Sequence, residues 1–306
     1  MKNIKSKPLY KDVLSLNVVG YVIVIAFSIM CLYPFLLLVI GSFTAESEIY
    51  RAGYSLLPKQ YSLDAYRVLL KNPAKILNAY GLTIFVTASG TALGIFFTAM
   101  TAFVLSRKDF KHADKFSFFF YFTTLFSGGL IPYYIVVSRY LHMKNTIWVL
   151  IIPGALQVFN ILIMRNFCKS IPDALSESAK IDGATNFKIF TRIYLPLMGP
   201  SIATIGLFIA LAYWNNWANA MLYIDRQELY PLQYLLYRMT SNAEFASSMA
   251  SGAAGDMPDM PKETVKLAMT VLSIGPVVLF YPFIQRYFVK GITVGSVKGE
   301  KYNKKL

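Results

Sequence analysis

The sequence predicts an all-α integral membrane protein with six transmembrane helices. Of the 306 residues, 56% are hydrophobic and only 15% are charged, with a mean hydropathy of +0.47, whereas soluble domains carry about 25% charged residues. Six stretches contain no Asp, Glu, Lys or Arg, and a helix needs roughly 20 apolar residues to cross a bilayer. These stretches are 13–45, 76–106, 116–138, 145–164, 193–224 and 267–285.

The apolar stretches favour helices over the strands of a membrane barrel. Lipid forces every backbone polar group to find a partner inside the chain, and the runs are continuous rather than alternating as barrel strands are. We expect helices at 17–43, 78–105, 116–138, 146–167, 197–224 and 265–287.

The first two predicted helices each contain a sequence feature that bears on how the helix is used. The first charge-free run follows four lysines and extends to Ala45, far beyond the apolar region of about 7–15 residues in a secretory signal, so it is expected to be an uncleaved helix. The second contains Gly90 and Gly94, a small-xxx-small pair that lets helices approach closely. That approach is equally compatible with packing inside one bundle and with a contact between subunits.

Two loops between the helices are long. In the loop 44–77, Leu63, Tyr66, Leu69 and Leu70 recur at helical spacing, which predicts a short surface helix. In the loop 225–264, the portion 246–255 is rich in Ala, Ser, Gly and Met and is predicted to be mobile.

The distribution of positive charge predicts the topology. With the N-terminus inside, the inner segments hold 19 lysines and arginines and the outer segments hold 10, so the positive-inside rule places both termini in the cytoplasm. We expect an N-terminal tail at 1–16, a transmembrane domain at 17–290 and a C-terminal tail at 291–306. The net charge of +14 is therefore interpreted as a topology signal and not as a nucleic-acid surface.

Several kinds of chemistry are missing from the sequence. It contains no phosphate-binding P-loop motif, no charged residue deep in a predicted helix of the kind that ion-coupled carriers use, and no Cys/His spacing typical of a metal site. His112 and His142 fall in loops, and Cys31 and Cys168 are too far apart in the topology to pair. No catalytic residue or metal site is expected, and the energy for transport would have to come from another subunit.

The polar segment 170–196 lies between two long apolar runs and is the most informative part of the chain. Ser170 and Asp173 fit a capping box at a helix start, Glu177 and Lys180 are spaced as an i, i+3 pair, and Gly183 falls where a left-handed residue would end the helix. A second amphipathic start then leads into the fifth predicted helix. The alternative interpretation is an interfacial hairpin that has no partner.

Short motifs give this segment a family resemblance. The tripeptides 177–179 (Glu-Ser-Ala) and 182–184 (Asp-Gly-Ala), followed by Leu195-Pro196, resemble the cytoplasmic EAA loop of ABC importer permeases; Ser178 stands where the family usually has Ala. Segments 126–132, 214–215, 231–233 and 291–299 extend the resemblance, over essentially the whole chain, to carbohydrate permeases of the MalG/LplC type.

The resemblance implies a fold, a set of partners and a coupling surface. The expected fold is that of a type I ABC importer permease in a bacterial cytoplasmic membrane, without cofactors of its own. A second homologous permease, two ATPase subunits that bind ATP and Mg²⁺, and an extracellular solute-binding protein that delivers the sugar would be its partners. The residues implied to couple to the ATPases are Glu177, Ser178, Ala179, Asp182, Gly183, Ala184, Leu195 and Pro196.

Residues of the substrate pathway are suggested by side-chain chemistry. Sugars are bound by planar amides and by aromatic faces, and both are dense near the end of the fifth predicted helix. The candidates are Gln157, Asn160, Tyr213, Trp214, Asn215, Asn216, Trp217 and Asn219. The alternative is that the tryptophans form an interfacial belt and the amides connect helices.

Three functional hypotheses remain open from sequence. The leading one is the permease subunit of a sugar-importing ABC complex, in which the partner permease could hold most of the sugar site. The second is an ABC permease for a peptide or amino acid, and the third is a facilitator that transports without an ATPase.

Overall fold

A computed structural model describes residues 9–252 and 262–296 of the chain. Within these residues every regular secondary-structure element is a helix, and the sole β-type pairing is an isolated bridge between Thr44 and Tyr61. The prediction of an all-α protein is confirmed for this part of the chain. The chain divides into two units, the first formed by Met1–Lys71 and Asn242–Ile274 and the second by Asn72–Ser241 and Gly275–Leu306.

The first unit contains α1 (Leu9–Ser42), α2 (Glu46–Ala52) and α3 (Asp64–Leu69), with the adjoining parts of α14 (Leu232–Gly252) and α15 (Glu263–Ser296). The short helix predicted in this loop is confirmed as α3, whose Leu69 is buried, and its place on the outer surface stays a prediction. The Glu46 carboxylate accepts hydrogen bonds from the backbone N–H groups of Lys262, Glu263 and Thr264 at 2.8–2.9 Å, which satisfies free donors at the start of α15.

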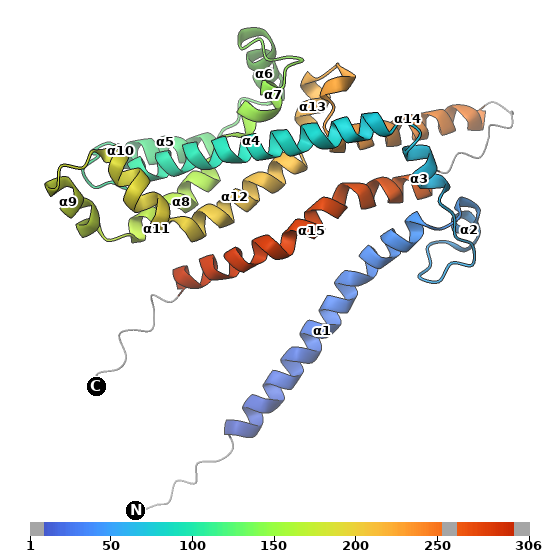
Figure 1. Cartoon of the computed structure of the whole chain (residues 1–306), viewed down its shortest axis with the longest axis horizontal. Helices are drawn as coiled ribbons and strands as arrows, with labels where there is room; N and C mark the ends of the chain where they lie inside the picture. Colours follow the sequence, from blue (N-terminus) through green and yellow to red (C-terminus); the bar gives the residue numbers. More distant parts are fainter. Residues whose placement is uncertain (1–8, 253–261, 297–306) are drawn as a thin grey trace, which may run out of the picture. The chain divides into compact units, whose positions relative to one another are not determined.

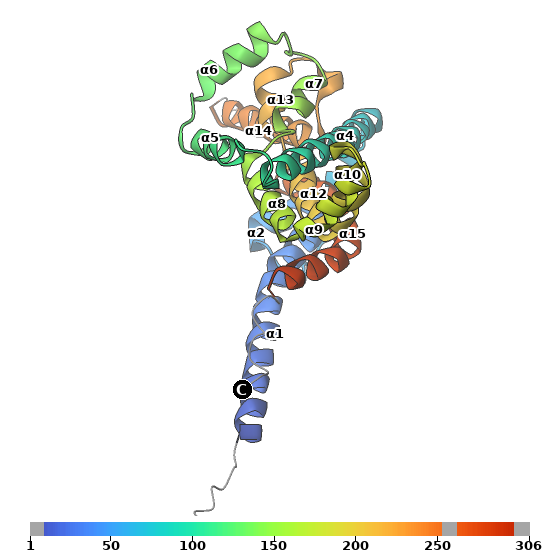
Figure 2. The same cartoon turned by 90° about the vertical axis from the view of Figure 1, so that its left-hand side faces the viewer.

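The second unit is built around α4 (Pro73–Ser106), against which α8 (Val158–Ser170) and α12 (Gly199–Trp214) pack (Figures 1 and 2). Gly90 and Gly94 lie at the closest approach. A side chain on Gly90 would collide with the ring of Tyr213, and one on Gly94 would lie 3.1 Å from the carbonyl oxygen of Ala155. The glycine pair therefore serves packing inside this unit.

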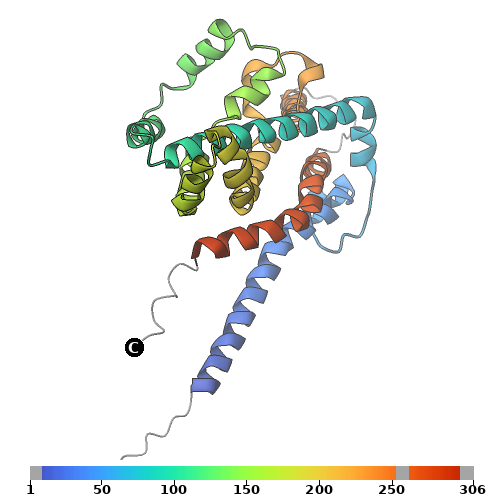
Figure 3. The same cartoon turned by 60° about the vertical axis from the view of Figure 1, so that its left-hand side comes forward.

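The third predicted helix, 116–138, is not continuous. It is replaced by α5 (Ala113–Leu125) and by α6 (Leu130–Ile135), which continues as a π-helical turn at Val136–Tyr140. The two pieces meet at an angle of 111°, a bend that Figure 3 displays. Gly129, with φ at +89°, adopts a conformation that disfavours other residues, so hydropathy predicted the apolar run but missed the bend.

The fourth and fifth predicted helices are also bent. The fourth begins as α7 (Trp148–Ile151), passes through a 3₁₀ turn at Ile152–Gly154 and continues at 48° as α8. The fifth, predicted at 197–224, begins at an 83° turn where α11 (Leu195–Leu197) meets α12. Pro153 and Pro200 lie at these breaks, and a proline lacks the N–H that would continue the hydrogen-bond ladder.

The fifth predicted helix also ends earlier than expected. α12 stops at Trp214, and the chain resumes as α13 (Ala218–Tyr223), followed by a 3₁₀ turn at Gln227–Leu229. α14 then covers most of the portion predicted to be mobile: 246–252 is helical, and 253–255 lies outside the described residues. Alanine and methionine are strong helix formers, which explains the helix, and the predicted mobility of this portion stays a prediction.

Among the described residues, two helices are long and apolar enough to cross a membrane, and up to five segments are if each bent helix pair is counted as one span. They are α1 over Asn17–Ser42, α4, and the three bent pairs described above. The sixth predicted segment, 265–287, falls inside α15, which is 34 residues long but is not among the five. The count of six spans and the cytoplasmic placement of both termini stay predictions.

Candidate functional site

The segment 170–196 folds as a short helix, a tight turn and a second helical start. The first helix, α9, runs from Asp173 to Ile181, and α10 covers Asn186–Ile189. The predicted capping box is wrong, because Ser170 ends α8 and its hydroxyl donates to the Phe167 carbonyl at 2.7 Å. Pro172 precedes α9 without a side-chain cap, and the capping hydroxyl belongs to Thr185, which accepts from the Lys188 N–H at 3.3 Å.

Gly183 forms the turn between α9 and α10. Its φ is +78°, the left-handed region that the sequence predicts. The N–H of Ala184 donates to the Ala179 carbonyl at 2.9 Å, and the N–H of Gly183 donates to the Lys180 carbonyl at 3.0 Å. These two bonds define a Schellman motif, so the turn satisfies the last carbonyls of α9 and rigidly directs the chain into α10.

The two faces of α9 differ in exposure. Ser176 is buried, and Ala179 and Ala184 are half-buried against the core of the second unit. Glu177, Ser178, Asp182 and Gly183 are exposed, together with three apolar side chains. These are Leu175, Ile181 and Phe187, which are 44%, 87% and 62% exposed. The two alanines thus pack inward, and the outward surface combines polar residues with exposed apolar ones.

Ion pairs attach both ends of α9 to the loop that follows α4. Lys108 lies 2.6 Å from Asp173 in the first turn, and Lys180 in the last turn donates to Asp109 at 2.5 Å. The guanidinium of Arg107 also donates to both oxygens of Asp109, at 2.8 and 2.9 Å. Arg107 and Lys180 hold the pKa of the Asp109 carboxyl well below its usual range. The sequence did not reveal this network, and the predicted Glu177–Lys180 pair is replaced by it.

Beyond α10 the chain forms a π-helical turn at Phe190–Tyr194 and then α11, which contains Leu195 and Pro196. Phe190 and Tyr194 are buried against Phe103 of α4, with ring centroids 5.4 and 4.7 Å apart. Leu195 is half-buried against the same core and Pro196 is exposed. The segment that follows α10 is therefore packed against the C-terminal part of α4 by buried rings, and α9 itself is held by ion pairs to the loop after α4.

The predicted pathway residues of α8 form a local pair. Asn160 is buried, and its amide donates to the side-chain oxygen of Gln157 at 3.2 Å. Gln157 is exposed and immediately precedes α8. Each amide thus satisfies part of the other's hydrogen bonding at the bend between α7 and α8.

The predicted residues at the end of α12 divide into buried and exposed groups. Tyr213 is buried, and its hydroxyl donates to the Ile151 carbonyl at 2.5 Å. Trp214 is also buried and lines an apolar cavity of about 520 Å³ between α4, α12 and α15. None of the other predicted pathway residues lines this cavity, so the structure does not bring the candidates together around one site.

The break between α12 and α13 is organised by amides. The side chain of Asn215 donates to the Leu211 carbonyl at 3.0 Å, and that of Asn216 accepts from the Asn219 N–H at 3.2 Å. These bonds fix the backbone on both sides of Trp217. The Trp217 ring is exposed and stacks on Tyr237 of α14, with centroids 4.7 Å apart. Tyr237 was not predicted, because the two rings are 20 residues apart and no sequence pattern links them.

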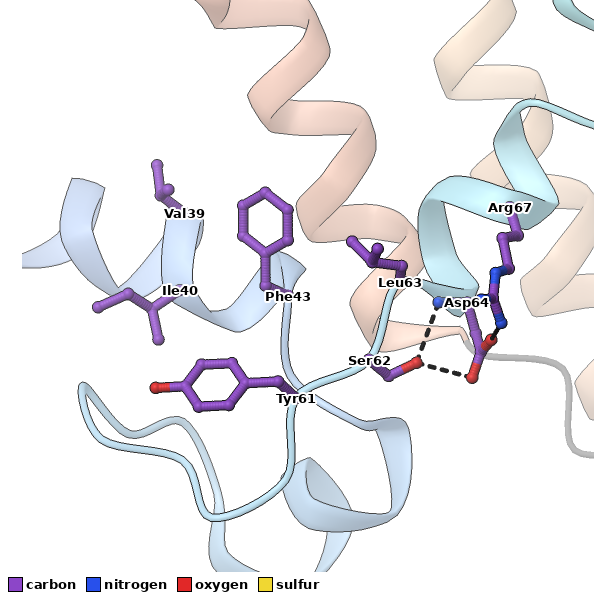
Figure 4. Close-up of a pocket in the computed structure, with 8 residues that line it drawn as sticks. All are labelled: Val39, Ile40, Phe43, Tyr61, Ser62, Leu63, Asp64 and Arg67. Atoms are coloured by element: carbon purple, nitrogen blue, oxygen red, sulfur yellow. Dashed lines mark hydrogen bonds and ion pairs between the residues drawn. The ribbon is translucent and has the colours of Figure 1, made fainter.

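A second cavity, of about 650 Å³, lies in the first unit (Figure 4). Phe43, Tyr61 and Leu63 contribute apolar surface, and Asp64 accepts from Ser62 at 2.7 Å and from Arg67 at 3.1 Å. Because its charged groups are engaged with each other, we assign no cargo role to this cavity. Across residues 9–252 and 262–296, no group of three His, Cys, Asp or Glu side chains is arranged to hold a metal ion.

Comparisons with known proteins agree over nearly the whole chain. The sequence model of the family described as binding-protein-dependent transport system inner membrane component matches residues 15–294. The polygalacturonan/rhamnogalacturonan transport system permease protein YtcP of Bacillus subtilis is 40% identical, over 91% of this chain and 96% of that protein. Protein LplC of the same organism is 39% identical, over 87% of this chain and 89% of that protein.

A solved structure is similar as well. It is a bacterial ABC transporter involved in the import of the acidic polysaccharide alginate, and it matches with a TM-score of 0.77 and 30% identity. The match covers 92% of this chain and all of the solved chain.

Proposed function

The chain belongs to the family of binding-protein-dependent transport system inner membrane components, and from that premise we propose that it is the permease subunit of an ATP-driven importer for an oligosaccharide. ABC permeases for sugars are its relatives. The observation that carries the proposal is the α9 element, a short helix with a rigid Gly183 turn that is attached at both ends to the loop following α4.

In this proposal α9 is the point where force enters the membrane domain. An ATPase subunit docks on the exposed surface formed by Glu177, Ser178 and Asp182, with Ile181 and Phe187 as apolar anchors. Exposed apolar side chains of this size favour a protein contact. Gly183, Ala179 and Ala184 keep the helix rigid, and Leu195 and Pro196 continue the connection toward α12. Movement of the ATPase would then displace α9 and α4 together.

The same proposal defines the partners. A second homologous permease completes the pathway, two ATPase subunits bind ATP and Mg²⁺, and an extracellular solute-binding protein delivers the cargo. This chain spans a bacterial cytoplasmic membrane several times, with both termini in the cytoplasm, and it carries out no covalent chemistry. The residues Gln157, Asn160, Tyr213, Trp214, Asn215, Asn216, Trp217 and Asn219 are proposed to border the pathway or to shape its walls.

The relatives favour an acidic oligosaccharide as the cargo. YtcP is named for polygalacturonan, a polymer of galacturonic acid, and the similar solved transporter imports alginate, which is described as acidic. We propose a uronate-containing oligosaccharide for this chain, in which each sugar ring carries a carboxylate.

Reconstitution of the complete complex tests this function. The tagged chain is purified from its own membrane, placed in proteoliposomes with its binding protein, and assayed for uptake of uronate and neutral oligosaccharides with and without ATP. We expect an ATPase to co-purify in stoichiometric amount and uptake to require ATP. Uptake without ATP by the chain alone would identify a facilitator, and uptake of peptides instead of sugars would contradict the proposed cargo.

A further inference from the structure

Four aromatic side chains gather where α13 and α14 meet. Tyr230 and Tyr234 are buried, with ring centroids 4.7 Å apart in an edge-to-face arrangement. Tyr237 lies next to Tyr234, and Trp217 stacks on Tyr237 at 4.7 Å with an interplanar angle of 26°. Tyr230 and Tyr234 form the buried part of the cluster, while the side chains of Trp217 and Tyr237 are 39% and 42% exposed. The cluster therefore presents aromatic surface to its surroundings.

A guanidinium group is fixed beside the buried pair of this cluster. Arg238 lies over the ring of Tyr230 at 5.8 Å from the ring centroid, and its Nη1 is 3.5 Å from the Tyr234 hydroxyl oxygen. The side chain is exposed, and within the described part of the chain it forms no ion pair with a carboxylate. An arginine has five N–H donors in a rigid fork, so most of its donors stay available while the two tyrosines orient it.

The backbone around Trp217 is held in place. The Trp217 N–H donates to the Asn215 carbonyl at 3.0 Å, and the Asn219 N–H donates to the Asn216 side chain at 3.2 Å. The start of α14 is tied to α4 through the Leu232 N–H, which donates to the Thr83 hydroxyl at 2.8 Å. An aromatic ring and a guanidinium are thus presented by two elements whose backbones are both anchored, which reduces the entropy lost on binding.

We propose that Trp217, Tyr237 and Arg238 form a binding subsite for one uronate ring of the cargo. The apolar C–H face of the sugar stacks on the exposed aromatic surface, and its carboxylate accepts two parallel N–H bonds from the Arg238 guanidinium, a geometry that lysine cannot provide. A neutral sugar would use the aromatic surface alone. The subsite rests on the function proposed above and specifies how that function selects an acidic cargo.

Binding to the purified complete complex in nanodiscs tests the subsite. The probe is trigalacturonate, titrated without the binding protein and followed by calorimetry, and its fully methyl-esterified form is the uncharged comparison. We expect Arg238→Gln to weaken binding of trigalacturonate about tenfold and to leave binding of the ester unchanged. Arg238→Lys should recover only part of the loss, and Trp217→Leu should weaken binding of both probes equally.

Arg226→Gln is the matched control. It makes the same charge change in the same outer segment, where the guanidinium lies 3.6 Å from Glu228, and it should leave both affinities unchanged. Equal weakening of acid and ester by Arg238→Gln, or an effect of Arg226→Gln as large as that of Arg238→Gln, would overturn the assignment.

The subsite and the proposed function fail separately. If trigalacturonate binds the wild-type complex without saturation, or if Arg238→Gln binds it as tightly as wild type, the subsite is wrong, while ATP-driven uptake of acidic oligosaccharides would still support the function. If the complex imports no oligosaccharide, the function itself is wrong.

Discussion

The two ends of α4 carry surfaces that are built in different ways. After Ser106, the loop residues Lys108 and Asp109 hold α9 by ion pairs, and buried rings join α10–α11 to Phe103. Toward Pro73, hydrogen bonds tie α4 to the segment before α14, and the surface there consists of stacked aromatic rings, amides and one arginine. A 34-residue helix separates the two ends by about 50 Å.

This difference matches the two roles proposed above for the two ends of the helix. Each exposed ion pair adds little stability, about 0–1 kcal/mol, but one at each end of α9 fixes how that short helix lies against the loop after α4. Aromatic rings and amides, in contrast, supply surfaces and directed hydrogen bonds suited to a sugar. The end with ion pairs fits the transmission of force, and the aromatic end fits recognition of the cargo.

The largest expected effect is at the turn of the ion-paired end. Gly183→Val should leave the chain inserted in the membrane but lower the sugar transported per ATP about tenfold, because a left-handed conformation costs a β-branched residue about 1–2 kcal/mol and the Schellman turn would rearrange. Uptake and ATP hydrolysis measured in the same proteoliposomes give this ratio.

Gly183→Asn is the matched control for this turn. Asparagine tolerates the left-handed region, so transport should stay close to wild type. Wild-type coupling in Gly183→Val would remove the rigid turn from the mechanism, and equal losses in both variants would mean that the glycine is needed for its size and not for its conformation.

A second comparison removes one carboxylate from each end. Asp109→Asn should lower sugar transported per ATP about threefold, because Arg107 and Lys180 lose a shared charged partner worth somewhat more than a single exposed pair. Asp225→Asn, whose carboxylate lies 3.0 Å from Lys144, should leave that ratio unchanged. If the two variants behave alike, the ion pairs at the two ends do not differ in role.

The effect of pH on Asp109 follows from the direction of its pKa shift. A folded-state pKa below the ordinary value means that the contribution of Asp109 to stability is fully present above its unfolded pKa and is lost as pH falls through its folded pKa. Between pH 5 and pH 8, titration of Asp109 should therefore cause no step in the amount of sugar that the wild-type complex transports per ATP. The pH dependence of this ratio should be the same in Asp109→Asn. Titration curves of both proteins over this range check it.

At the aromatic end, Asn215→Leu should lower sugar uptake about twofold while the yield of assembled complex stays near wild type. The reason is that the Asn215 amide closes the last turn of α12 next to Trp217, and one hydrogen bond contributes roughly 1 kcal/mol.

Asn78→Leu is the control, because the Asn78 amide donates to the Glu228 carbonyl and connects α4 to the outer segment. Its assembly yield should fall at least as much as its uptake. Unchanged uptake in Asn215→Leu would assign Asn215 to packing.

The smallest effect on transport is expected at Glu46, in the first unit. Burial alone raises the pKa of this carboxyl, but hydrogen bonds from Thr264, Glu263 and Lys262 outweigh it and lower the pKa. The stabilisation is therefore present above the unfolded pKa and is lost as pH falls through the folded one. Glu46→Gln should cost about 1 kcal/mol at pH 7, as the loss of a helix cap does, and less at pH 4. Thermal unfolding at both pH values measures this difference, and a gap that widens at pH 4 would contradict it.

Sequence patterns predicted the features that depend on composition or on neighbouring residues. The helical class follows from charge-free runs, and the Gly183 turn follows from a glycine between two helical patterns. The bends at Gly129 and near Pro200 were missed because hydropathy reports how apolar a segment is and not the direction of its axis. Contacts such as Asp109–Lys180 and Trp217–Tyr237 join residues 71 and 20 positions apart, so only the fold brings them together.

The most direct test of the account asks where an ATPase touches the chain. A photo-crosslinking amino acid is placed at Ile181, which is 87% exposed on the α9 element, and, in a second protein, at Leu57, which is 85% exposed in the first unit. The tagged complex is irradiated in native membranes and the adducts are identified by mass spectrometry. We expect an ATPase adduct from position 181 and none from position 57. No ATPase adduct at 181, with an intact and active complex, would contradict the claim that force enters through α9.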